Sequence, residues 1–60
     1  MTWYGKIKQL RGEKTIEEVS EDLVLSPDTY MAYERGDRTP NEAVKESIAE
    51  YYGVNVSDIW

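Results

Sequence analysis

The sequence lacks two of the residue types on which enzymatic and metal chemistry most often depend. Its 60 residues include neither cysteine nor histidine. A disulfide, a thiol nucleophile, a serine–histidine pair and the ordinary zinc sites are therefore excluded. A chain of this length is also too short for a sizeable substrate cleft. We therefore expect a protein that is not an enzyme and that carries no metal and no cofactor.

Long apolar runs are absent as well. No stretch approaches the roughly 20 apolar residues that cross a bilayer, and the chain does not open with the hydrophobic segment of a signal peptide. The absence of cysteine suits a reducing compartment, although it does not prove one. We expect a single domain over residues 1–60, located in the cytoplasm and without membrane contact.

Segment 15–36 begins with a strong helix signal. Thr15 is a good N-cap residue, and Glu18 follows it at the spacing of a capping box. The next positions recur at i, i+3, i+4 and i+7, which is the spacing of one helix face. This inward face consists of Ile16, Val19, Ser20 and Leu23.

A second helix signal follows after only a few residues. Ser26 is a second N-cap, Pro27 suits the first helical position, and Gly36 stands where a helix ends in a left-handed residue. Tyr30 and Tyr33 lie on one face and are expected in the core. Two helices joined by so tight a turn must cross steeply, which is typical of a helix-turn-helix.

The remainder of the chain also has helical patterning. Residues 2–11 predict a first helix with an apolar face, and residues 41–52 predict a fourth helix capped by Asn41. Ser57 is expected to cap a last helical turn over 57–60. Without any strand pattern, the fold class is all-α, a compact five-helix domain with the helix-turn-helix at helices 2 and 3.

Segment 15–36 resembles the helix-turn-helix of the Cro/phage-repressor (XRE-type) family. The most specific part is YERGDRTP at 33–40, while IKQLR at 7–11 is similar to the family's first helix and 48–60 to its closing helices. The resemblance implies a cytoplasmic DNA-binding transcriptional regulator, a repressor of phage or mobile-element type. It also implies a homodimer on a palindromic operator in double-stranded DNA, with helix 3 reading the major groove.

The resemblance also assigns roles to individual positions. The implied DNA-binding residues are Lys14, Thr15, Ser26, Pro27, Asp28, Thr29, Met31, Ala32, Arg35 and Arg38. Pro27, Asp28, Met31 and Ala32 match positions at the base edges, and Ser26 and Thr29 match positions near the phosphates. Arg11 and Glu34 match a structural salt bridge between the first and third helices.

Two positions in the motif and two aromatic residues near the C-terminus need separate expectations. Relatives often open helix 2 with glutamine, where this chain has Ile16, and they place glycine in the turn, where it has Val24. The turn must therefore contain a strained residue or follow a slightly different path. A domain this small cannot bury all the large apolar residues near its C-terminus. Tyr51 and Trp60 are therefore expected at the surface, as candidate dimer contacts.

The distribution of charge leaves a second hypothesis open. By count, residues 1–14 carry a net charge of +3, residues 15–34 carry −6 and residues 35–60 carry −2, which gives the total of −5. An acidic protein approaches DNA at an electrostatic cost unless bases gather on its docking face. The alternative is a protein-binding module that turns its acidic helices 2 and 3 toward a basic protein partner. An anti-repressor that covers the DNA-binding face of another regulator would be one example.

Overall fold

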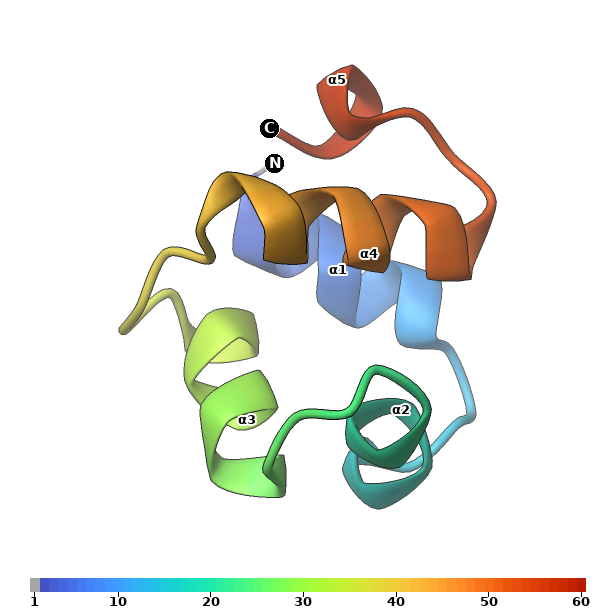
Figure 1. The fold of residues 1–60 in the computed structure, drawn as a ribbon, viewed down its shortest axis with the longest axis vertical. Coiled ribbons are helices and arrows are strands. Elements are labelled where there is room, and N and C mark those ends of the chain that lie inside the picture. The colour runs from blue at the N-terminus through green and yellow to red at the C-terminus, as the bar shows by residue number, and fades with distance from the viewer. Residues whose placement is uncertain (1) are drawn as a thin grey trace.

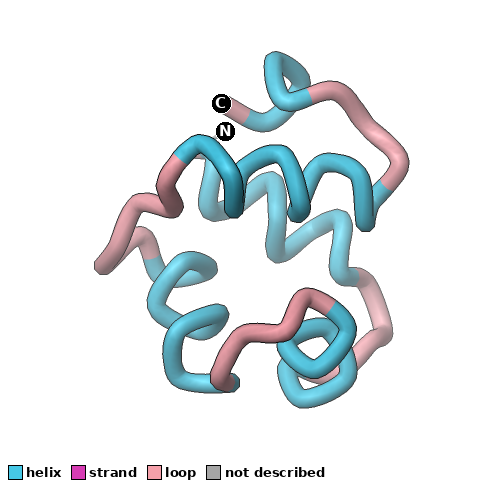
Figure 2. Tube along the Cα trace, viewed as in Figure 1, coloured by secondary structure: helices cyan, strands magenta, loops and turns pink. Residues whose placement is uncertain are grey.

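The structure is a bundle of short helices joined by short loops. The computed structural model describes residues 2–60, and within that range it contains five α-helices and no strand (Figures 1 and 2). The helices are α1 (Trp3–Arg11), α2 (Ile16–Asp22), α3 (Pro27–Arg35), α4 (Glu42–Tyr52) and α5 (Val56–Ile59). None of these helices combines the length and the hydropathy needed to span a membrane. The predicted all-α class and the predicted order of helices are confirmed.

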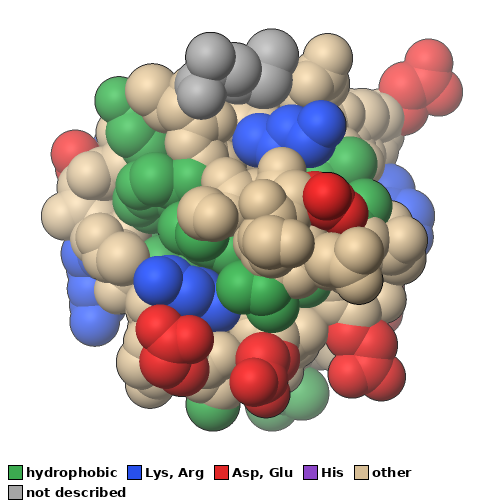
Figure 3. Space-filling view, turned by 90° about the horizontal axis from the view of Figure 1, so that it is seen from above, with side chains coloured by type: hydrophobic (Ala, Val, Ile, Leu, Met, Phe, Trp, Pro, Cys, Tyr) green, Lys and Arg blue, Asp and Glu red, His purple; other side chains and the backbone are tan. Residues whose placement is uncertain are grey.

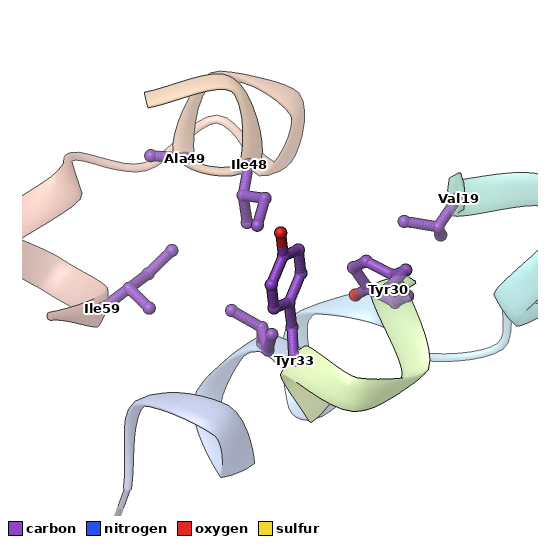
Figure 4. Close-up of a cluster of buried hydrophobic side chains, with 7 residues drawn as sticks. Val19, Tyr30, Tyr33, Ile48, Ala49 and Ile59 are labelled. Atoms are coloured by element: carbon purple, nitrogen blue, oxygen red, sulfur yellow. The ribbon is translucent and has the colours of Figure 1, made fainter. Parts of the chain in front are cut away.

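The helices pack around one small core. α1 contacts α3 and α5, α2 contacts α3, and α4 contacts α5. Figure 1 shows α2 and α3 together at one side of the bundle and α5 at the opposite side, next to the two chain ends. Figure 4 shows side chains from several helices pointing into the space between them. The buried apolar residues are Ile7, Val19, Tyr30, Tyr33, Ile48, Ala49 and Ile59.

Side chains cap the first four helices at their N-termini. Each capping oxygen accepts a hydrogen bond from the backbone N–H three residues ahead, at 2.9–3.2 Å. The capping residues are Thr2, Thr15, Ser26 and Asn41. The three caps predicted from the sequence, at 15, 26 and 41, are thus confirmed. These bonds are local, which is why sequence spacing alone locates them.

The prediction that Ser57 caps the last helix is wrong. α5 starts after Asn55, and Ser57 lies inside the helix. The Asp58 carboxylate accepts a 3.0 Å hydrogen bond from the Asn55 backbone N–H. Asn55 and Asp58 therefore have the spacing of a capping box, and this arrangement outweighs the weaker signal from an isolated serine.

Three helices end with the same hydrogen-bond arrangement. In α2, α3 and α4, a backbone N–H beyond the helix end bonds back to the carbonyl five residues earlier: Leu25 to Ser20 at 2.8 Å, Asp37 to Ala32 at 2.9 Å and Val54 to Ala49 at 3.0 Å. This Schellman motif requires a left-handed residue just before that N–H. Gly36 and Gly53 occupy this position after α3 and α4, with φ of 76° and 70°.

The corresponding residue after α2 is Val24, with φ of 59°. The backbone of this turn therefore follows the same path as the two turns that contain glycine, and the residue in the left-handed conformation is a strained valine. A β-branched side chain is unfavourable in this conformation because its Cβ crowds the backbone. Packing of the valine side chain does little to offset this strain, because Val24 is 89% exposed.

Candidate nucleic-acid interface

The outward face of α3 is narrow and chemically mixed. Asp28, Met31 and Arg35 follow one another at i, i+3 and i+7, and all three are exposed, so they form one stripe along the helix. Pro27 is exposed at the start of the helix, and Ala32 is half-buried beside the stripe. The positions expected at the base edges therefore form one face, with Ala32 at its margin. This face offers one carboxylate, one thioether and one guanidinium to a ligand.

Ser26 and Thr29 form a polar pair at the start of α3. The Ser26 hydroxyl accepts from the Thr29 N–H at 3.2 Å and donates to the Thr29 Oγ1 at 2.7 Å. Thr29 Oγ1 can still donate its own proton outward, toward an acceptor such as a phosphate oxygen. The pair thus fixes one hydroxyl donor at the N-terminal end of the helix.

Two exposed guanidinium groups lie where α3 ends, Arg35 at the last helical position and Arg38 on the well-anchored loop that follows. A Cβ built on Gly36 would lie 2.7 Å from ring atoms of Tyr4, so the aromatic ring packs directly on this loop. Pro40 is buried at the other end of the loop. Arg35 forms an exposed ion pair with Asp37, with 3.4 Å between Nε and Oδ2, whereas Arg38 is exposed and takes part in none of the ion pairs within residues 2–60.

Arg11 brings three segments of the chain together. Its Nε and Nη2 donate to the two Glu34 carboxylate oxygens at 2.7 and 3.1 Å, and its Nη1 donates to the Lys14 carbonyl at 2.7 Å. The hydrogen bond with Glu34 raises the pKa of the arginine, and burial partly opposes this shift. The ion pair expected between the first and third helices is present, and it also holds the Lys14 segment beside the end of α3. The Lys14 segment and the end of α3, which both carry implied DNA-contacting residues, are therefore both bonded to the Arg11 guanidinium.

The Lys14 side chain makes contacts that the sequence did not suggest. Its ammonium donates to the Tyr51 hydroxyl at 2.9 Å and lies 4.8 Å from the centroid of the same ring. The hydroxyl in turn donates to Asp22 Oδ2 at 2.7 Å. These bonds raise the pKa of Lys14, with the hydrogen bond to Tyr51 as the largest cause. The partners lie 37 and 29 residues apart in the chain, so no local spacing could have revealed them.

Two phenol groups join α3 to α4 beneath the interface. The hydroxyls of Tyr30 and Tyr52 lie 2.5 Å apart and share a hydrogen bond. Burial raises the pKa of both tyrosines, and their mutual hydrogen bond raises the pKa of Tyr30 further and lowers that of Tyr52. Both groups are protonated at neutral pH, so the contact is an uncharged one. It fixes the position of α3 relative to the body of the domain.

Tyr51 and Trp60 are less exposed than their expected place at the surface implied. Both are half-buried, because Tyr51 packs at a ring distance of 5.1 Å against Tyr52, and Trp60 at 6.0 Å against Trp3. Lys45 lies over the Trp60 ring, with Nζ 5.7 Å from its centroid. The two chain ends thus cover each other with aromatic rings. Figure 3 shows hydrophobic side chains still visible on this face, next to lysine or arginine side chains.

Eight of the ten implied DNA-contacting residues are exposed in the structure. The exposed ones are Lys14, Thr15, Ser26, Pro27, Asp28, Met31, Arg35 and Arg38, and the half-buried ones are Thr29 and Ala32. Within residues 2–60, no group of three carboxylate, histidine or cysteine side chains is close enough to hold a metal ion.

Comparisons with known proteins agree with this geometry. A family profile described as "Helix-turn-helix domain" matches residues 5–59. The chain is 36% identical, over 57 residues, to the "Cryptic phage CTXphi transcriptional repressor RstR" of Vibrio cholerae. The match covers 92% of this chain and 51% of that relative, so the chain spans about half the relative's length. No solved structure matches the chain. The helix pair at 16–35, the Arg11–Glu34 pair and these similarities together show that the chain belongs to the helix-turn-helix family of Cro/phage-repressor (XRE) type.

Proposed function

We propose that this protein is a DNA-binding transcriptional regulator, a repressor of phage or mobile-element type, whose α3 enters the major groove. The observation that carries the proposal is the exposed α3 stripe, which ends in Arg35 and is followed by Arg38 on the anchored loop; Arg11 holds the Lys14 segment beside the end of α3. The similarity to a phage transcriptional repressor supports the same function. In this arrangement the cations contact phosphates and thereby position the stripe over the base edges.

The negative net charge does not contradict this proposal. Four acids of α2, at 17, 18, 21 and 22, are exposed, but none of them lies on α3. Along the α3 stripe the only carboxylate is Asp28, and it can accept a hydrogen bond from a cytosine amino group. The carboxylates of α2 therefore lower the affinity for DNA in general. They also restrict binding to sites at which the α3 stripe fits the bases. We expect weak binding to random DNA and a strong dependence on salt.

The operator in this proposal is palindromic and bound by a homodimer. Half-sites one helical turn apart are separated by about 34 Å. The Cα extents of the domain are 25 × 23 × 22 Å, so two copies in contact can lie side by side at this spacing. Tyr51 and Trp60 are the proposed contacts, because they still expose part of their rings on α4 and at the C-terminus.

The variant Arg38→Ala tests the DNA-binding proposal. It is expected to weaken binding to all duplexes by a similar factor and to reduce the slope of log affinity against log salt by about 0.9, since one phosphate contact is lost. The measurement is fluorescence anisotropy with a random duplex and then with candidate operators, over a range of salt concentrations.

The matched control is Lys8→Gln, which removes one positive charge from an exposed position on α1 outside the proposed interface. This variant is expected to keep the slope of the original protein. An unchanged slope for Arg38→Ala, or an equal loss in both variants, would contradict the assignment of Arg38 to a phosphate. Absence of binding to any duplex at low salt would overturn the DNA-binding proposal for this chain.

A second candidate function is supported by the exposure of the α2 acids. The carboxylates at 17, 18, 21 and 22 all face solvent, which suits a module that binds a basic protein such as another regulator. In that case, the double variant Glu21→Lys with Asp22→Lys abolishes partner binding, and DNA has no effect on it. The salt titration separates the two functions, because only the first requires affinity for DNA.

A further inference from the structure

A shallow pocket lies between the α2–α3 turn and α4, away from the α3 stripe. Its volume is about 430 Å³. In Figure 1 the turn lies just below the second half of α4. The lining residues are Asp22, Leu23, Val24, Ser47, Glu50 and Tyr51. No residue of α3 lines this pocket, so a ligand there would leave the proposed DNA-reading face free.

One wall of the pocket is a residue that the isolated fold does not favour. Val24 has a left-handed backbone and an 89% exposed side chain, although glycine occupies the same position after α3 and α4. Neither the backbone nor the packing of this domain explains a valine here. A side chain that gains nothing within the fold can contribute outside it, through apolar contact with a partner.

The other side of the pocket determines the charge of such a partner. Asp22 and Glu50 are exposed carboxylates, and neither takes part in an ion pair within residues 2–60. Asp22 Oδ2 accepts a hydrogen bond from the Tyr51 hydroxyl, which in turn accepts one from the Lys14 ammonium, so the two carboxylates and one ammonium leave this wall with a net negative charge. The chemistry of this wall therefore selects a positively charged side chain and repels a phosphate.

We infer that this pocket is a docking site for a segment of a partner protein that presents an arginine next to an aliphatic side chain. The arginine binds between Asp22 and Glu50, and the aliphatic group packs on Val24 and Leu23. Arginine is favoured over lysine because its planar fork can meet two carboxylates at once. The pocket and the α3 stripe share no residue, so the inference does not depend on DNA binding; Tyr51 is the one lining residue that is also a proposed dimer contact.

The test is a titration followed by two-dimensional amide NMR of the whole chain. The probe is acetyl-leucyl-arginyl-leucine amide, and the comparison peptide has glutamine in place of arginine. The arginine peptide is expected to shift the amide signals of residues 22–24, 47, 50 and 51 in a saturable way, with a Kd on the order of 1 mM. The glutamine peptide is expected to bind at least about tenfold more weakly, since it makes no charge-assisted hydrogen bond.

Three variants identify the groups responsible. Glu50→Gln is expected to weaken the arginine peptide about tenfold, whereas Glu46→Gln makes the same charge change on α4 outside the pocket and is expected to have little effect. Val24→Gly is expected to weaken the peptide about fivefold while the thermal midpoint rises, so a loss of binding cannot be ascribed to unfolding.

Several outcomes would overturn the inference. They are the absence of saturable shifts, equal binding of the glutamine peptide, an unchanged affinity in Val24→Gly, and equal losses in Glu50→Gln and Glu46→Gln. Tyr51 is also a proposed dimer contact, so its signal alone can shift with protein concentration; concentration-dependent shifts of residues 22–24, 47 and 50 would assign the pocket to a second copy of this chain and would likewise overturn the inference. A DNA titration of the same samples is a separate readout, so failure of the proposed DNA binding would not be mistaken for failure of the pocket.

Discussion

Replacement of Glu34 by alanine is expected to destabilise the domain by about 3–5 kcal/mol, because it leaves the Arg11 guanidinium partly buried without its counterion. The Arg11 side chain is only 18% exposed, and Glu34 supplies two of its three hydrogen bonds. A domain of this size is stable by about 3–9 kcal/mol in total. The variant should therefore be partly or wholly unfolded at 37 °C. Urea unfolding followed by tryptophan fluorescence measures the change.

The double variant Arg11→Met with Glu34→Leu serves as the control. Removal of both charges leaves no unpaired ion, so the double variant is expected to be more stable than Glu34→Ala alone. The bond from Arg11 to the Lys14 carbonyl is lost in the double variant, so full recovery is not expected. A cost below about 1 kcal/mol for Glu34→Ala would mean that the pair behaves as an exposed surface ion pair and does not hold α1 to α3.

Replacement of Val24 by glycine is expected to stabilise the domain by about 1 kcal/mol. A left-handed conformation costs a residue with a Cβ about 1–2 kcal/mol, and glycine avoids this cost while it loses about 0.5–1 kcal/mol more backbone entropy on folding. The side chain contributes little to the core, being 89% exposed. Differential scanning calorimetry should show a midpoint about 4–8 °C higher.

Two matched variants establish the cause of this gain. Val24→Ala removes most of the exposed side chain but keeps a Cβ, so it should recover only part of the gain. Gly53→Ala places a Cβ at the equivalent position after α4, where φ is 70° and no other atom lies within 4 Å of the new Cβ. It should therefore lose stability by a similar amount. If Val24→Gly melted at or below the midpoint of the original protein, backbone strain in the turn would not be the controlling factor.

The sequence was most informative where structure depends on neighbours in the chain. The caps at Thr15, Ser26 and Asn41 and the stop at Gly36 were predicted because each involves residues only a few positions apart. The strained turn at Val24 was one of two expected alternatives, and the structure selected it. The error at Ser57 arose because two capping residues, Asn55 and Ser57, compete within three positions. A single short turn provides too little periodicity to distinguish between them.

The candidate site was less predictable because its environment depends on distant contacts. Sequence positions 14, 35 and 38 indicated three available cations, but the structure pairs Lys14 with Tyr51 and Arg35 with Asp37. Only the fold brings Asp22, Glu50 and Tyr51 around one pocket. The Arg11–Glu34 pair was expected solely through family resemblance, since a separation of 23 residues leaves no local signal. The contacts in the helices therefore followed from the sequence, and the contacts between them required the structure.

The strained valine also bears on how this protein can evolve. Every valine codon is one nucleotide away from a glycine codon, so the more stable turn is accessible to a single mutation. Most substitutions that change a binding surface reduce stability, and a protein tolerates them only while it stays above the threshold for folding. A lineage that acquired glycine at position 24 would gain a margin of about 1 kcal/mol. This margin could offset the destabilisation caused by new side chains along the α3 stripe. The lineage could in this way come to recognise a new DNA sequence.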